Sequence, residues 1–209
     1  MYFLKKSNQT VHSMKDVINV DGKKVLVRDD IFTWSNLISF SRVVVTIPII
    51  YLHYENNREI SLIVTVLIFY GAISDYLDGL VARLRNEISE LGKILDPVAD
   101  KVMAFFLFFY TVWLGWIPLW FFLIGVVRDV CIMIGSGYIK SKRGRVAMST
   151  MSGKISVNVL ALYWIAVFFF REATTVHHVL MFASLLMMVI SFVHYFYRYK
   201  KILDGAEFN

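Results

Sequence analysis

Long apolar stretches separated by short polar connections dominate the sequence. Six of them approach or exceed the length that crosses a bilayer as a helix, about 20 residues, and they fall at residues 35–53, 60–81, 94–114, 117–139, 155–170 and 176–197. Backbone groups inside hydrocarbon must be hydrogen-bonded within their own segment, so each stretch is predicted to be an α-helix. The pattern therefore predicts an all-α integral membrane protein, built as a six-transmembrane-helix bundle.

Positive charges gather on one side of this predicted bundle. Of the 22 Lys and Arg residues, 17 fall in residues 1–33, in the second and fourth connections and in the C-terminal tail. The opposite connections contain only Arg58 and Arg171. Because Lys and Arg near span ends collect on the cytoplasmic side, we expect a multi-pass protein of the inner (cytoplasmic) cell membrane with both termini in the cytoplasm.

The first 33 residues differ from the rest of the chain. We expect a short cytoplasmic N-terminal arm at 1–33, the bundle at 34–200 and a cytoplasmic tail at 201–209. In the arm, VINVDGKKVLV alternates apolar and polar residues around Asp21-Gly22, which is typical of a β-hairpin. An amphipathic helix lying along the membrane is the alternative, and the lysines favour anionic lipid headgroups in either form.

Composition excludes several other classes of protein. A hydrophobic content of 57% is too high for an ordinary soluble domain. The single cysteine, Cys131, excludes an intramolecular disulfide and a zinc site of paired cysteines. The net charge of +6 follows from topology and attraction to lipid, so we expect membrane lipids and no nucleic acid as partners.

Four aspartates interrupt the second and third apolar stretches. Asp75 and Asp78 are three residues apart, and Asp96 and Asp100 are four apart, so each pair shares one helix face. Because the connection between the two helices is short, the four carboxylates are expected to face one space. Carboxylates near lipid need compensation, and oxygen ligands suit Mg²⁺ or Mn²⁺. Taken singly, Asp75 or Asp100 could equally be a cap or a solvated helix end.

Four carboxylates are enough to hold two divalent ions. Two such ions about 3.5 to 4 Å apart are a recurrent device for displacement at phosphorus, because they stabilise both the attacking and the leaving oxygen. The sequence therefore predicts a two-ion phosphoryl-transfer site between the second and third helices.

The spacing of the whole stretch is distinctive. It reads D-x2-D-G-x2-A-R-x8-G-x3-D-x3-D, with Gly79, Ala82, Arg83 and Gly92 at the positions between the aspartates. In this it resembles the CDP-alcohol phosphatidyltransferases, which are membrane enzymes of phospholipid synthesis. The resemblance implies a six-helix fold and metal-dependent transfer of a phosphatidyl group from CDP-diacylglycerol to an alcohol, with release of CMP.

The resemblance also implies roles for the residues of this motif. Three aspartates would ligate the metal ions: Asp75, Asp78 and Asp96. Asp100 would deprotonate the acceptor hydroxyl and share the second metal site, as a carboxylate within hydrogen-bond reach of an alcohol can do. Three further residues would face the CDP moiety: Gly79, Ala82 and Arg83.

Other positions resemble the family members that use glycerol 3-phosphate. Asn36, Ser39 and Arg42 are similar to their N-x2-T-x2-R, with Ser39 in place of Thr, and Arg128-Asp129 is similar to their Arg-acidic pair in the fourth helix. Their G-K-x-K-T stretch corresponds to residues 153–157, which read Gly-Lys-Ile-Ser-Val and so lack the second lysine and the threonine.

A phosphorylated acceptor needs cationic groups near the metal site. Arg128 and Lys154 could supply them, although Arg128 could equally balance an acidic group in the bundle and Lys154 could mark a helix end. Glycerol 3-phosphate is therefore the expected acceptor, and acceptors of the cardiolipin, inositol phosphate or serine type are alternatives.

Two other classes of protein also contain intramembrane acids. An ion-coupled transporter binds cations on such groups during alternating access, and a catalytically silent scaffold would only bind lipid. Members of the family that this chain resembles commonly pair, so a homodimer is an open alternative to a monomer.

Overall fold

The computed structural model describes residues 17–20, 23–28, 34–85, 88–89, 92–143 and 150–204. In the strands and at residues 34–35, 75–85, 92–97 and 143 it describes the backbone without the side chains. The chain divides into two compact units, Met1–Leu107 and Phe108–Asn209.

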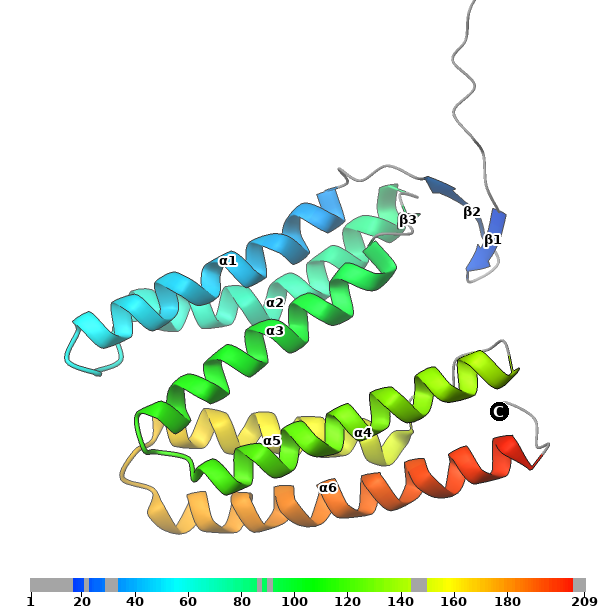
Figure 1. The fold of residues 1–209 in the computed structure, drawn as a ribbon. Helices are drawn as coiled ribbons and strands as arrows, with labels where there is room; N and C mark the ends of the chain where they lie inside the picture. Colours follow the sequence, from blue (N-terminus) through cyan, green and yellow to red (C-terminus); the bar gives the residue numbers. More distant parts are fainter. Residues whose placement is uncertain are drawn as a thin grey trace, which may run out of the picture. The chain divides into compact units, whose positions relative to one another are not determined.

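The first unit is built on α1 (Trp34–Glu55), α2 (Leu62–Arg85) and most of α3 (Gly92–Trp113). Figure 1 shows α1 and α2 running along each other, blue and cyan, and joined by a short turn. A hydrogen bond of 2.7 Å between Ser41 Oγ and the Tyr70 hydroxyl links them. The three helices confirm the helices predicted for this half of the chain, and α2 continues four residues further than its predicted end.

The buried face of α1 is mostly polar. Its buried residues recur every three or four positions, as one helix face requires: Asn36, Ser39, Arg42, Thr46, Ile49 and His53. The opposite face exposes large apolar side chains: Leu37, Phe40, Val44, Ile47 and Tyr51. This arrangement suits a helix whose outer face meets lipid and whose inner face meets the polar groups of a bundle.

A glycine sets the contact between α2 and α3. A Cβ placed on Gly71 would overlap Cε of Met103 and come within 2.9 Å of its sulfur. Both residues are buried, with 8% of Met103 exposed. The absence of a side chain at Gly71 therefore lets Met103 of α3 lie directly against the backbone of α2.

The N-terminal arm forms a small sheet with the connection between α2 and α3. Strands β1 (Val17–Val20) and β2 (Lys23–Arg28) pair antiparallel, with Val17 opposite Leu26. This pairing confirms the predicted hairpin, whose turn at Asp21-Gly22 lies outside the described residues. Strand β3 (Ile88–Ser89) then pairs parallel with β2. Strand β2 of the arm and strand β3 of the α2–α3 connection therefore lie side by side, while the cytoplasmic placement expected for both segments stays a prediction.

The second unit contains α4 (Leu119–Arg143), α5 (Met151–Phe169) and α6 (Thr174–Leu203). Helix α6 packs closely on both α5 and α4. Helix α5 begins four residues before its predicted start, because the Thr150 Oγ1 accepts a hydrogen bond of 3.1 Å from the Gly153 N–H and caps it. Thr150 therefore supplies a start signal that the apolar pattern alone does not contain.

Four of these helices are long and apolar enough to cross a membrane: Asn36–Glu55, Leu119–Lys142, Met151–Phe169 and Thr174–Leu203. The part of α2 whose side chains the structure describes, Leu62–Ser74, is also apolar. The structure thus supports four spans by length and composition, while the crossings predicted for α2 and α3 stay predictions.

We expect the close approach at Gly71 to be essential for packing. Gly71→Leu forces a side chain into Met103, and overpacking costs about 1–3 kcal/mol, more than the gain in helix propensity of roughly 1 kcal/mol on replacing glycine. The melting temperature in detergent should fall, and adding Met103→Ala should recover part of the loss. The control is Gly137→Leu, since a Cβ on Gly137 meets nothing within 4 Å. Equal melting temperatures for the two leucine variants would contradict this packing.

Candidate active site

The aspartate pairs lie on the faces of α2 and α3 that approach each other. Asp75 lies four residues after Gly71, and Asp78 lies seven residues after Gly71. The backbone therefore places all three on one face of α2. Asp100 lies three residues before Met103, and Asp96 lies seven residues before Met103, so these three share one face of α3. Since Gly71 meets Met103, the predicted sharing of one space by both pairs agrees with the helix register.

The side chains of three predicted metal ligands, Asp75, Asp78 and Asp96, lie outside the described part of the structure. Among the residues that the structure does describe, no three His, Cys, Asp or Glu side chains gather as a metal-binding cluster. The four positions still provide a donor set of carboxylate oxygens, which fits a hard divalent cation. The metal assignment therefore stays a prediction that the backbone register supports.

The predicted base, Asp100, is in contact with a buried cation. Its Oδ1 forms an ion pair with Nη1 of Arg42 on α1. The Arg42 side chain is 2% exposed, whereas that of Asp100 is 43% exposed. The arginine therefore reaches the carboxylate from the buried side, and part of the carboxylate stays accessible. The sequence identified Arg42 as part of a motif similar to that of the enzymes that use glycerol 3-phosphate, but it did not identify a partner for it.

The residues predicted to face the CDP moiety follow the aspartates along α2. Gly79, Ala82 and Arg83 belong to the last turns of this helix, which ends at Arg85. Their side chains lie outside the described part of the structure. Arg83 is thus placed near the α2–α3 connection by its backbone, and its role toward the nucleotide stays a prediction.

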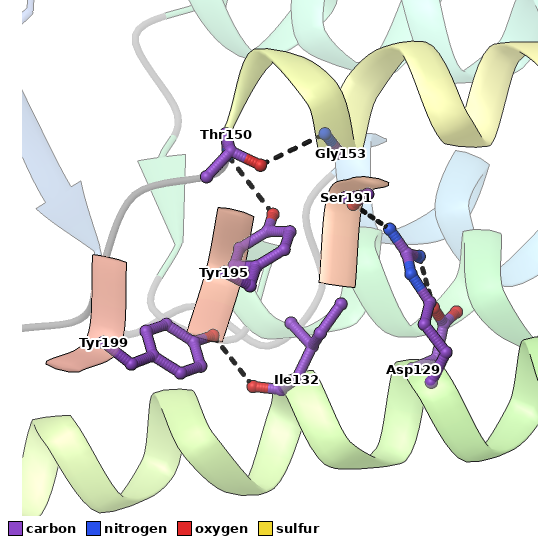
Figure 2. Close-up of polar contacts among 8 residues, drawn as sticks. Asp129, Ile132, Thr150, Gly153, Ser191, Tyr195 and Tyr199 are labelled. Atoms are coloured by element: carbon purple, nitrogen blue, oxygen red, sulfur yellow. Dashed lines mark hydrogen bonds and ion pairs between the residues drawn. The ribbon is translucent and has the colours of Figure 1, made fainter. Parts of the chain in front are cut away.

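In the second unit, the predicted acceptor residue Arg128 contacts Asp129 and Ser191, both of which Figure 2 labels. Its Nη1 lies 2.6 Å from Oδ1 of Asp129, and its Nη2 donates a hydrogen bond of 2.5 Å to Ser191 Oγ on α6. The Arg128 side chain is 12% exposed and Ser191 is fully buried. Arg128 is therefore held in place by two neighbours, of which the sequence identified only Asp129.

Lys154 lies near the start of α5, where α6 holds the helix end in place. The Thr150 N–H donates a hydrogen bond of 3.3 Å to the Tyr195 hydroxyl, as Figure 2 shows. His194 Nδ1 and Ser152 Oγ share another, of 2.9 Å. His194 and Tyr195 of α6 lie within about one turn of Ser191. A single turn of α6 therefore contacts both Arg128 and the start of α5. Lys154 itself is exposed.

An apolar cavity of about 400 Å³ lies between α4 and α6. The ring of Tyr199 lies against Gly135, where a Cβ would overlap it, and the Tyr199 hydroxyl donates a hydrogen bond of 3.0 Å to the Ile132 carbonyl (Figure 2). No carboxylate is among the described residues that line the cavity, and Lys200 is the one charged side chain among them.

Comparison with known proteins identifies the class. Residues 32–193 match the model of the CDP-alcohol phosphatidyltransferase family. The match covers well over half of the chain, so the chain belongs to this family, as its aspartate motif indicated. It is therefore a membrane transferase of phospholipid biosynthesis.

The similar proteins act on different acceptors. The chain is 36% identical over 170 residues to the CDP-diacylglycerol–glycerol-3-phosphate 3-phosphatidyltransferase of Aquifex aeolicus, which covers 77% of this chain and 92% of that protein. It is also 36% identical to the CMP-forming cardiolipin synthase of Streptomyces coelicolor, but only over 70 residues, 34% of this chain and 33% of that protein. The match to the first protein is thus the more extensive one.

Proposed function

We propose that this enzyme transfers the phosphatidyl group of CDP-diacylglycerol to glycerol 3-phosphate and releases CMP. The observation that carries the proposal is the similarity to the Aquifex aeolicus enzyme over 92% of that protein's length. The cardiolipin synthase match supports a second candidate, the same transfer to a lipid alcohol, over about a third of the chain.

The reaction replaces the diphosphate oxygen that joins phosphorus to CMP with the ester oxygen of the acceptor. The acceptor hydroxyl attacks the phosphorus that carries the diacylglycerol, its proton passes to Asp100, and the bond from that phosphorus to the CMP oxygen breaks. A carboxylate close to the hydroxyl contributes typically 10²–10⁴-fold as general base. The 43% exposure of the Asp100 side chain is compatible with access by an alcohol.

The aspartates Asp75, Asp78 and Asp96, with a share from Asp100, would hold Mg²⁺ or Mn²⁺. When bound, the ions would neutralise charge on the diphosphate and so make CMP a better leaving group. Arg83, at the end of the same helix as the first two aspartates, would add a guanidinium for the diphosphate of the donor. The contact between Gly71 and Met103 supports this arrangement, because it brings together the two helix faces to which the aspartates belong.

Arg128 would bind the phosphate of the acceptor. Two of its nitrogens are engaged by Asp129 and Ser191, and its buried Nε makes no hydrogen bond within the described part of the structure. A guanidinium has five N–H donors, so donors are left for an anion. Lys154, exposed near the start of α5, would provide a second cation.

The acceptor can be identified by incubating the purified full-length protein with CDP-diacylglycerol, Mg²⁺ or Mn²⁺ and a panel of alcohols. We expect CMP to be released fastest with glycerol 3-phosphate and not at all in excess EDTA. The panel includes phosphatidylglycerol, inositol phosphate and serine. Fastest release with phosphatidylglycerol would favour the cardiolipin synthase reaction instead. Ion flux in liposomes together with no CMP from any acceptor would contradict a transferase.

We expect Asp100→Asn to lower kcat by about 10²–10⁴-fold, with little change in the affinity for CDP-diacylglycerol. The amide keeps the shape of the side chain but cannot accept the acceptor proton. The matched control is Asp204→Asn, because Asp204 is an exposed aspartate at the end of α6. Loss of donor binding comparable to the loss of kcat would show that Asp100 is chiefly a metal ligand.

A further inference from the structure

A buried arginine inside an apolar helix calls for an explanation. Arg42 is 1% exposed and belongs to the polar face of α1. A charged side chain at membrane depth is costly, so such residues commonly face a partner with a function in the bundle. A guanidinium stays protonated in proteins, so Arg42 must be compensated by an anion.

Asp100 is an anion that Arg42 contacts, and the contact is asymmetric. One oxygen of Asp100 pairs with Nη1 of Arg42, whose side chain is 2% exposed, while the carboxylate side chain is 43% exposed. The ion pair therefore occupies the buried side of the carboxylate. The accessible side remains available to a small molecule.

The helix that carries Arg42 is itself fixed in position. One turn further along α1, Thr46 Oγ1 donates a hydrogen bond of 3.1 Å to the Arg42 carbonyl. The residue before Arg42, Ser41, is joined to Tyr70 of α2 at 2.7 Å. The guanidinium is thus attached to a backbone that is held against the helix carrying Asp75 and Asp78.

We propose that Arg42 is a positioning residue for Asp100, holding one carboxylate oxygen from the buried side so that the other is presented to the acceptor hydroxyl. This inference rests on the proposed function, in which Asp100 is the base. In this proposal Arg42 acts through Asp100 and not directly on the substrate. Its contribution is to fix the geometry of proton transfer, where a misplacement of about 1 Å can cost roughly 10²-fold in rate.

The alternative is that the pair serves the fold alone, by neutralising two charges in an apolar setting. The two explanations differ in what they expect of the catalytic constants. A purely structural pair affects the amount of folded enzyme, whereas a positioning residue affects kcat of the folded enzyme and loses its effect once the base is gone.

The test is a double-mutant cycle on the purified full-length enzyme, with kcat, donor KM and melting temperature measured for each variant. We expect Arg42→Gln to lower kcat by about 10- to 100-fold with donor KM nearly unchanged. In the Asp100→Asn background the same change should have almost no further effect. Arg42→Lys, which keeps the charge but loses the planar fork, should be intermediate. The control is Arg58→Gln, since Arg58 is exposed in the turn after α1.

Three results would overturn the inference while leaving the proposed function intact. The first is that the losses of kcat from Arg42→Gln and Asp100→Asn multiply in the double variant. The second is that Arg42→Gln changes only the donor KM. The third is that Arg42→Gln lowers the melting temperature while kcat stays at the wild-type value. If Arg42→Gln does not fold, Arg42→Lys carries the test, and an unchanged kcat in that variant contradicts positioning. A wild-type enzyme that releases no CMP with any acceptor would instead overturn the proposed function, and this inference with it.

Discussion

Charge inside apolar helices is the constraint on which the rest of this structure depends. In α3, Asp96 and Asp100 precede a long apolar run, and α2 carries Asp75 and Asp78 on the backbone face that approaches α3. Such groups are stable near lipid only when cations compensate them. One cation comes from the protein itself, as the Arg42 guanidinium that pairs with Asp100. The side chains of Asp75, Asp78 and Asp96 lie outside the described part of the structure, and a divalent metal site is the compensation that we propose for them.

The same constraint explains how the helices are patterned. Helix α1 buries polar side chains and exposes apolar ones, the reverse of a helix on the surface of a soluble protein. In the second unit, α6 holds polar groups of both neighbouring helices through Ser191, His194 and Tyr195. Polar residues thus connect helices across buried interfaces, while the apolar residues cover the outside.

The sequence predicted the elements better than it predicted their contacts. Six apolar stretches became six helices, and the alternating arm became a hairpin, because hydrophobic periodicity and turn residues are local signals. The shared face of each aspartate pair followed from helix geometry alone. The start of α5 was misplaced because a capping threonine, rather than the apolar run, determines where that helix begins.

Contacts between distant residues could not be predicted in this way. Arg42 and Asp100 are separated by 58 positions in the sequence, and Ser191 lies 63 positions from Arg128. No local pattern specifies which side chain such a cation will meet, because the partner depends on how whole helices pack. Ser191 in particular gives no signal in the sequence, since a serine in an apolar helix most often hydrogen-bonds to its own backbone. The pairing of β3 with the arm depends on packing in the same way.

The metal site can be tested by binding of Mn²⁺ to the purified protein, followed by the loss of the paramagnetic resonance signal of the aqueous ion. We expect saturable binding by the wild-type protein, a large loss of binding in Asp78→Asn and in Asp96→Asn, and unchanged binding in Asp204→Asn. Equal Mn²⁺ binding by all four proteins, or none by the wild type, would contradict the proposal that the aspartates of α2 and α3 form a metal site.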